Sequence, residues 1–107
     1  MAVEAKHPGD ILSRSYLEPR GWSARELARR LGVPVTRVTR LLNRQNGMTA
    51  DTAILLSRVF SITSDEYWMK LQTDYDLANA REARDAAERS KEDRINGRRA
   101  TAAPRHR

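Results

Sequence analysis

The chain has 107 residues, enough for a single domain, and no cysteine, so a disulfide scaffold and a cysteine-ligated zinc or iron–sulfur site are excluded. It carries 20 Lys and Arg against 14 Asp and Glu, a net charge of +6, and most of the basic residues are Arg, whose guanidinium matches phosphate and guanine geometry. No apolar run approaches the ~18 residues of a membrane span and no signal segment is recognisable, so we expect a soluble, cytoplasmic protein that does not contact membranes.

The first helix is predicted to begin at Pro8, because proline suits the first position of a helix, where its missing N–H is not needed. Pro19 and Gly21 are expected to end it. Its apolar stripe is formed by Ile11, Leu12, Tyr16 and Leu17.

The second helix has a complete start signal. Ser23 is placed to cap its N-terminus, Glu26 completes a capping box, and Trp22 with Leu27 forms a hydrophobic staple. Gly32 is expected to end this helix, because glycine tolerates the left-handed backbone of a C-terminal cap. Its buried face is predicted to be Leu27, Ala28 and Leu31.

Three further helices are predicted. The third follows a turn at residues 33–34, the fourth begins near Thr49, and the fifth is capped by Ser64. Their inward-facing residues are expected to be Val38, Leu41 and Leu42; Ala53, Leu56, Ser57 and Phe60; and Trp68, Leu71 and Tyr75. No strand-length alternation is present, so the predicted fold class is all-α, five short helices around one core.

The sequence changes character after Leu77, where the apolar content falls to alanines. Opposite charges four residues apart predict a solvated extension of the fifth helix; they are Arg81–Asp85, Arg84–Glu88, Asp85–Arg89 and Arg89–Asp93. Asn96 and Gly97 are expected to stop it, and residues 98–107 are expected to be disordered when alone. We therefore divide the chain into a folded domain, residues 1–80, and a charged helical extension with a basic tail, residues 81–107.

The positive charge is concentrated in one block. Residues 20–44 carry seven Arg and one Glu, as much net charge as the whole chain, whereas residues 45–80 are net acidic and residues 81–107 carry +4. The same block contains the spacing Ala28-x3-Gly32-x5-Val38-x2-Leu41. A small residue at the helix crossing, a glycine in the turn and two apolar residues that seat the second helix are typical of a helix-turn-helix. We interpret the block as a DNA-binding helix-turn-helix.

The free face of the third helix carries side chains suited to a major groove. The predicted base-contacting residues are Val35, Thr36, Thr39, Arg40 and Asn43, where Arg40 matches guanine O6 and N7 and Val35 a thymine methyl. The predicted phosphate-contacting residues are Ser23, Arg25, Arg37 and Arg44. Because one subunit cannot span two half-sites a helical turn apart, we expect a homodimer on a palindromic operator of double-stranded DNA.

Several segments resemble the HigA/VapI antitoxins of the XRE-type helix-turn-helix class. The resemblance rests on residues 7–12 (HPGDIL), 17–23 (LEPxGxS), 26–33 (ELAxxxGV), 47–53 (GxTADTA), 66–72 (ExWxxLQ) and 75–77 (YDL). It implies a lambda-repressor-like domain in a small dimeric antitoxin that represses its own operon and neutralises a HigB-like ribonuclease toxin. The sequence departs from the family pattern at Ala24, at residues 34–35, at Arg44, where glycine is common, and at Leu55, where the family is usually polar.

Other interpretations remain open. His7 is interpreted as a residue that opens the first helix rather than as a catalytic group, and Asp74 and Asp76 as solvated carboxylates, so we expect no enzyme activity, cofactor or metal. Dimer or partner contacts are assigned to Leu55, Ile62, Trp68 and Met69, although core packing would also explain them. The alternative functions are a stand-alone XRE-type repressor without a toxin, and a toxin-binding inhibitor with little DNA binding.

Overall fold

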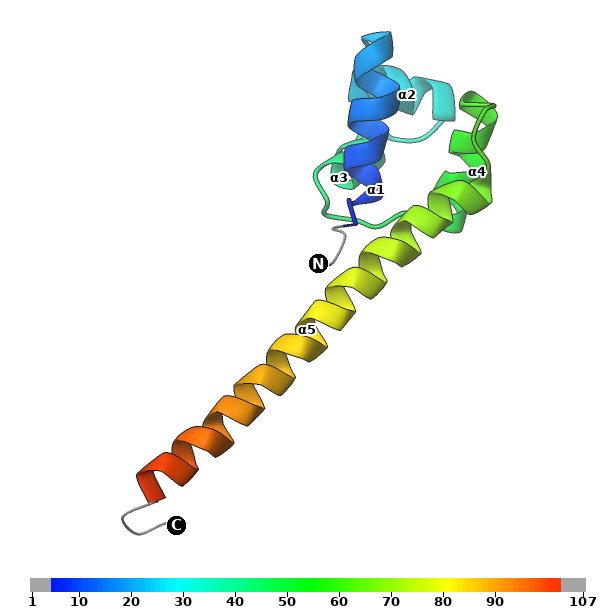
Figure 1. The fold of residues 1–107 in the computed structure, drawn as a ribbon. Coiled ribbons are helices and arrows are strands. Elements are labelled where there is room, and N and C mark those ends of the chain that lie inside the picture. The colour runs from blue at the N-terminus through cyan, green and yellow to red at the C-terminus, as the bar shows by residue number, and fades with distance from the viewer. Residues whose placement is uncertain (1–4, 103–107) are drawn as a thin grey trace. The chain divides into compact units, whose positions relative to one another are not determined.

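The computed structural model describes residues 5–102, and the side chains of residues 5–95. The chain divides into two units, Met1–Asp76 and Leu77–Arg107, so the boundary falls four residues before the predicted one. The described residues form helices and no strand, which confirms the all-α class (Figure 1). No helix among them is both long and apolar enough to cross a membrane.

The N-terminal helix differs from the predicted single α-helix. It consists of α1 (Pro8–Ile11), the π-helical η1 (Leu12–Leu17) and the 3-10 turn η2 (Glu18–Arg20). Pro19 therefore lies inside the last helical turn instead of ending the helix, because a proline at the second position of so short a turn has no N–H that needs an intrahelical partner. The chain reverses at Gly21, whose φ of 67° is in the left-handed region that glycine tolerates.

Helix α2 (Ala24–Leu31) begins as its sequence indicates but with half of the predicted capping box. The Glu26 backbone N–H donates to Ser23 Oγ at 3.1 Å, while the Glu26 carboxylate pairs with Arg29 at 2.5 Å and with Arg30 at 2.6 Å. The hydrogen bond from Arg29 lowers the pKa of Glu26. Trp22 stacks on Phe60, with ring centroids 5.6 Å apart, so it links the start of α2 to the core.

Helices α3 (Val35–Leu42), α4 (Ala50–Val59) and α5 (Asp65–Ala102) complete the first unit, in which α5 contributes its first turns. Thr49 and Ser64 cap α4 and α5 as predicted, accepting from the backbone N–H of Thr52 at 3.2 Å and of Tyr67 at 3.0 Å. The predicted inward residues are buried in the case of Val38, Leu41, Ala53, Leu56, Phe60 and Trp68, and half-buried in the case of Leu42, Ser57, Leu71 and Tyr75.

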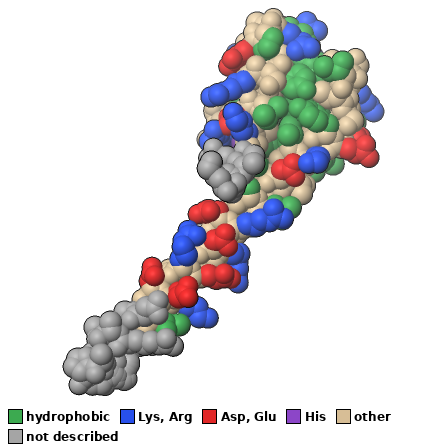
Figure 2. Space-filling model, in the orientation of Figure 1, with side chains coloured by type: hydrophobic (Ala, Val, Ile, Leu, Met, Phe, Trp, Pro, Cys, Tyr) green, Lys and Arg blue, Asp and Glu red, His purple; other side chains and the backbone are tan. Residues whose placement is uncertain are grey.

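The second unit contains the continuation of α5, on which basic and acidic side chains alternate (Figure 2). The helix passes through Asn96 and Gly97 to Ala102, so the predicted stop at that pair is wrong. A glycine inside a helix costs only about 1 kcal/mol relative to alanine, and the alanine- and arginine-rich flanks favour helix. Arg89 pairs with Glu82 at 3.4 Å rather than with a residue four positions away. Of the tail predicted to be disordered, residues 98–102 belong to α5, so that part of the prediction is wrong, and residues 103–107 lie outside the described residues.

Candidate nucleic-acid interface

Helices α2 and α3 are joined by the short turn that the sequence predicts. Ala28 is buried at the crossing, and its carbonyl accepts from Gly32 N–H at 2.8 Å and from Val33 N–H at 3.1 Å. Gly32 has φ of 75°, which a residue with a side chain adopts only under strain. Pro34 is extended, with φ of −62° and ψ of 146°, and starts α3 at Val35. The structure therefore has the helix-turn-helix geometry that the Ala28–Gly32 spacing indicates.

The outer face of α3 carries the five predicted base-contacting residues. Thr36, Arg40 and Asn43 are exposed, whereas Val35 and Thr39 are half-buried. The Thr39 hydroxyl donates to the Thr36 carbonyl at 3.1 Å, which leaves its methyl group as the less constrained contact. The opposite face is seated on the core by Val38 and Leu41. One side of α3 thus fixes the helix while the other presents hydroxyl, guanidinium and amide groups to solvent.

The basic residues around this face have different electrostatic environments. Within residues 5–95, Arg25 and Arg40 make no ion pair, and both are exposed. Arg29 and Arg30 share Glu26, so part of the charge on α2 is neutralised locally. The Arg25 and Arg40 guanidinium groups are therefore accessible to an anionic ligand without first breaking an ion pair, as the predicted phosphate and base contacts require.

The other two arginines predicted to contact phosphates are engaged with carboxylates of this chain. Arg37 pairs with Asp51 at 2.6 Å and also donates to Thr52 Oγ1, while Arg44 pairs with Asp10. The Arg44 guanidinium lowers the pKa of Asp10. Any contact that Arg37 or Arg44 makes with a phosphate therefore competes with, or is added to, an existing ion pair.

Sequence reasoning missed how tightly α1 and α3 approach each other. A Cβ built on Gly9 would lie 2.1 Å from the Leu41 carbonyl oxygen, so only glycine fits between the two backbones. His7 caps α1, because its Nδ1 accepts from Gly9 N–H at 2.9 Å, and its burial lowers the pKa of the imidazole. The motif His7-Pro8-Gly9 is the sequence signal that could have predicted this close approach. In the structure it packs against the C-terminal end of α3.

The loop after α3 is held by a second residue whose role the sequence did not reveal. Gln72 accepts from Met48 N–H at 2.5 Å and donates to Asp76 at 2.9 Å. A Cβ on Gly47 would approach the Gln72 side chain to 2.9 Å. Gln72 thus fixes the path of the chain from α3 into α4. In the described part of the chain, no three His, Asp or Glu side chains form a group that could hold a metal ion.

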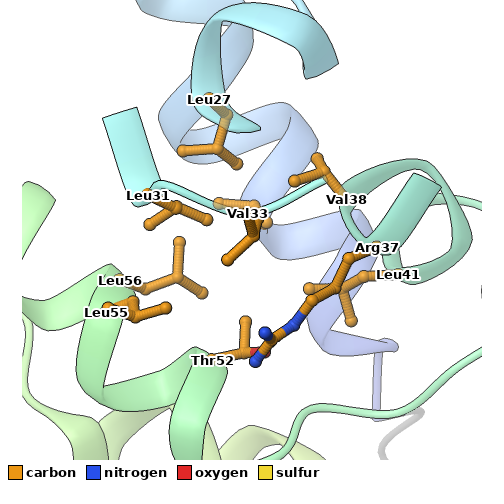
Figure 3. A pocket seen from close by; sticks show the side chains of 10 residues that line it. Leu27, Leu31, Val33, Arg37, Val38, Leu41, Thr52, Leu55 and Leu56 are labelled. Carbon is orange, nitrogen blue, oxygen red and sulfur yellow. The ribbon is translucent and has the colours of Figure 1, made fainter. Parts of the chain in front are cut away.

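The predicted dimer or partner residues do not share one environment. Trp68 is fully buried, so it belongs to the core, as its predicted inward face indicates, and core packing accounts for it without a dimer or partner contact. Met69 and Leu55 are half-buried, and Ile62 is 84% exposed. Leu55 lies with Leu31 and Val33 around a small apolar pocket between α2, α3 and α4 (Figure 3). Apolar side chains also gather on the face of the first unit seen in Figure 2.

Comparison with known proteins places this geometry in a family. The helix-turn-helix family HTH_3 matches residues 14–67. Virulence-associated protein I of Dichelobacter nodosus is 44% identical over 78 residues, which are 73% of this chain and 71% of that relative.

Solved structures of antitoxins share the fold. The Pseudomonas aeruginosa antitoxin HigA with the higBA promoter is 39% identical, with a TM-score of 0.73 over 78% of this chain and 90% of that one. An addiction module antidote protein of the HigA family from Coxiella burnetii is 36% identical, with a TM-score of 0.72 over 81% and 95% of the two chains. These similarities confirm the resemblance that the motifs indicated. The chain belongs to the XRE-type helix-turn-helix family HTH_3 and is similar in sequence and fold to HigA-type antitoxins.

Proposed function

We propose that this protein is a sequence-specific DNA-binding antitoxin of a type II toxin–antitoxin module, which acts in the cytoplasm, represses its own operon as a homodimer and neutralises a HigB-like ribonuclease toxin. The observation that carries the DNA-binding part is the outer face of α3, where Thr36, Arg40 and Asn43 are exposed on a helix seated by Val38 and Leu41. A helix presented in this way fits the major groove.

Three groups on this face have distinct roles in the proposal. Arg40 donates two hydrogen bonds to guanine, Asn43 pairs with an adenine or donates to a phosphate, and Thr36 contacts a base edge or the backbone. Arg25 near the start of α2 neutralises a phosphate, and Ser23 marks the α2 N-terminus, whose N–H groups suit an anion. Base contacts specify the sequence, and the phosphate contacts set the register of the helix.

The proposed dimer is supported by the spacing of half-sites on DNA. Two half-sites on one face of a duplex are ~34 Å apart, which is further than one recognition helix reaches. A two-fold homodimer on a palindrome is therefore the proposed arrangement. Met69 and Ile62 are available for a dimer or toxin contact, because neither is fully buried. Trp68 is fully buried and is not available for such a contact.

The toxin part rests on similarity. HigA-type antitoxins are among the relatives in sequence and fold, and one of them was solved with the higBA promoter. The proposed partner surface includes Leu55, which is half-buried at the edge of the core, and Ile62, which is 84% exposed.

Two experiments test the proposal separately. A gel shift with the DNA upstream of this reading frame is expected to show a discrete complex that an excess of shuffled duplex does not remove; no shift would leave only the inhibitor function. Inspection of the adjacent reading frame, followed by co-expression, is expected to give a small toxin whose growth inhibition this protein relieves. A neighbour without toxicity would instead support a stand-alone repressor.

A further inference from the structure

Arg37 belongs to α3 but points away from the proposed DNA-facing side chains and toward α4. Its guanidinium donates to Asp51 Oδ2 at 2.6 Å and to Thr52 Oγ1 at 2.8 Å, and its Nε lies 3.2 Å from the same hydroxyl. Thr49 Oγ1 donates to Thr52 Oγ1 at 3.0 Å and caps the N-terminus of α4. One planar guanidinium is thus held by two neighbouring residues of α4, of which Thr52 is drawn beside Arg37 in Figure 3.

Thr52 is the buried member of this contact, and its hydroxyl gives the contact its structural role. Thr52 is only 7% exposed, so its hydroxyl depends on protein partners, and a hydrogen bond from a charged donor is stronger than one from a neutral donor. The Arg37 side chain is 37% exposed and that of Asp51 is 70% exposed, so the ion pair alone contributes little stability. The contact matters for geometry instead. The planar Arg37 guanidinium, bound to both Asp51 and Thr52, restrains the distance of α3 from α4 and the rotation of α3 about its axis.

The other backbone and polar supports of α3 join it to α2 and α1. Its start is set by the turn from α2, and its end is set by the close approach of Gly9 to Leu41 and by the pair of Arg44 with Asp10. The backbone of α3 lies closest to α2 and α1, and that of α4 lies closest to α2, while Val38 and Leu41 of α3 share the apolar core with Leu56 of α4. A rotation of α3 about its own axis would redirect every side chain on its outer face, and displacements of ~1 Å are enough to disrupt polar recognition.

We infer that Arg37, held by Asp51 and Thr52, is a positioning residue that orients the recognition helix for sequence discrimination, and is not itself a phosphate contact. This inference rests on the proposed DNA-binding function and replaces the role that sequence reasoning assigned to Arg37. The two roles predict opposite effects for a change at Asp51, which touches Arg37 but lies outside the proposed DNA-contacting set.

The test is Asp51→Asn, with affinity measured on the upstream duplex and on a shuffled duplex of the same composition. If Arg37 positions α3, Asp51→Asn weakens binding to the upstream duplex, leaves the shuffled duplex unchanged or slightly tighter, and lowers the discrimination ratio roughly tenfold. If Arg37 contacts a phosphate, removal of the competing carboxylate frees the guanidinium and tightens binding to both duplexes. Tighter binding to both, or an unchanged ratio, overturns the inference.

A matched control is Asp65→Asn. Asp65 is an exposed carboxylate in the first turn of α5, as Asp51 is in the first turn of α4, so both changes remove one negative charge from a helix N-terminus. Among the described residues, Asp65 makes no side-chain hydrogen bond or ion pair with α3, and its variant is expected to keep the wild-type discrimination ratio. A ratio that falls equally in both variants contradicts the inference, because net charge would then explain it.

A double variant separates positioning from loss of stability. Arg37→Gln is expected to lower the discrimination ratio, and Arg37→Gln with Asp51→Asn is expected to lower it no further, because both changes break the same contact. A phosphate contact would instead reduce the salt slope by about 0.9 in either background. Affinities are measured well below each melting temperature, so the folded fraction does not influence the ratio. If the wild-type protein itself binds both duplexes equally, the proposed function fails rather than this inference.

Discussion

Replacement of Gly9 by alanine tests the packing of α1 against the recognition helix. The new Cβ would lie 2.1 Å from the Leu41 carbonyl oxygen and 3.0 Å from its carbon, and both atoms belong to the backbone of α3. Backbone atoms cannot avoid the new Cβ by a change of rotamer, as a flexible side chain could. The variant must therefore move α1, move α3, or break the cap from His7 to Gly9.

Two opposing terms set the magnitude. Alanine is a better helix former than glycine by about 1 kcal/mol, so an uncrowded substitution inside α1 would stabilise the protein. Insertion of a carbon into a packed contact costs about 1–3 kcal/mol, and an approach of this kind to backbone lies at the upper end. We expect a net loss of about 2 kcal/mol, which corresponds to a fall in melting temperature of roughly 10 °C for a unit of this size.

Thermal unfolding followed by circular dichroism at 222 nm measures this loss. The matched control is Gly21→Ala, where φ is 67° but no atom lies within 4 Å of the added Cβ, so only backbone strain of about 1 kcal/mol is expected. The reasoning is refuted if Gly9→Ala melts at or above the wild-type temperature, because helix propensity would then outweigh the contact with Leu41.

Three further predictions concern the site and its supports. Arg40→Ala is expected to weaken operator binding by about 1–3 kcal/mol and to relax specificity at one base pair; equal losses on operator and shuffled DNA would make Arg40 a phosphate contact. Arg44 has φ of 63°, so Arg44→Gly is expected to be about 1 kcal/mol more stable than Arg44→Ala in urea unfolding, since both lose the pair with Asp10 but only glycine relieves the backbone; equal stabilities would contradict this. The pKa of His7 is lowered from 6.5 in the folded state, so the stability that its neutral form contributes is present above pH 6.5 and is lost as the pH falls through the folded pKa; a melting temperature that rises on acidification below pH 6.5 would contradict it.

Local signals allowed most of the fold to be predicted. The caps at Ser23, Thr49 and Ser64 and the left-handed Gly32 depend on residues within one or two turns, so their physics is visible in the sequence. The inward faces followed from helical periodicity. The match of residues 14–67 to a helix-turn-helix family agrees with the helix-turn-helix that these signals predicted.

Long-range contacts could not be predicted in the same way. The approach of Gly9 to Leu41 and the pair of Arg37 with Asp51 join residues 32 and 14 positions apart, and no periodic pattern fixes which side chains meet across that separation. Trp68 and Met69 are adjacent in the sequence, yet one is fully buried and the other half-buried. Helix α5 continues through Gly97 because the helix propensity of the flanking residues outweighs the cost of one glycine.

The salt dependence of binding to specific and shuffled DNA tests the central claim, that α3 is the recognition helix of a sequence-specific DNA-binding dimer. Since Arg37 and Arg40 have other proposed roles, at most the five remaining Arg of residues 20–44 neutralise phosphates, so log affinity plotted against log salt is expected to fall with a slope of up to about −4.5 per subunit. On the upstream duplex the affinity at physiological salt is expected to exceed that on the shuffled duplex by about 10³ or more. Equal affinities for the two duplexes, or a flat response to salt, would contradict the account.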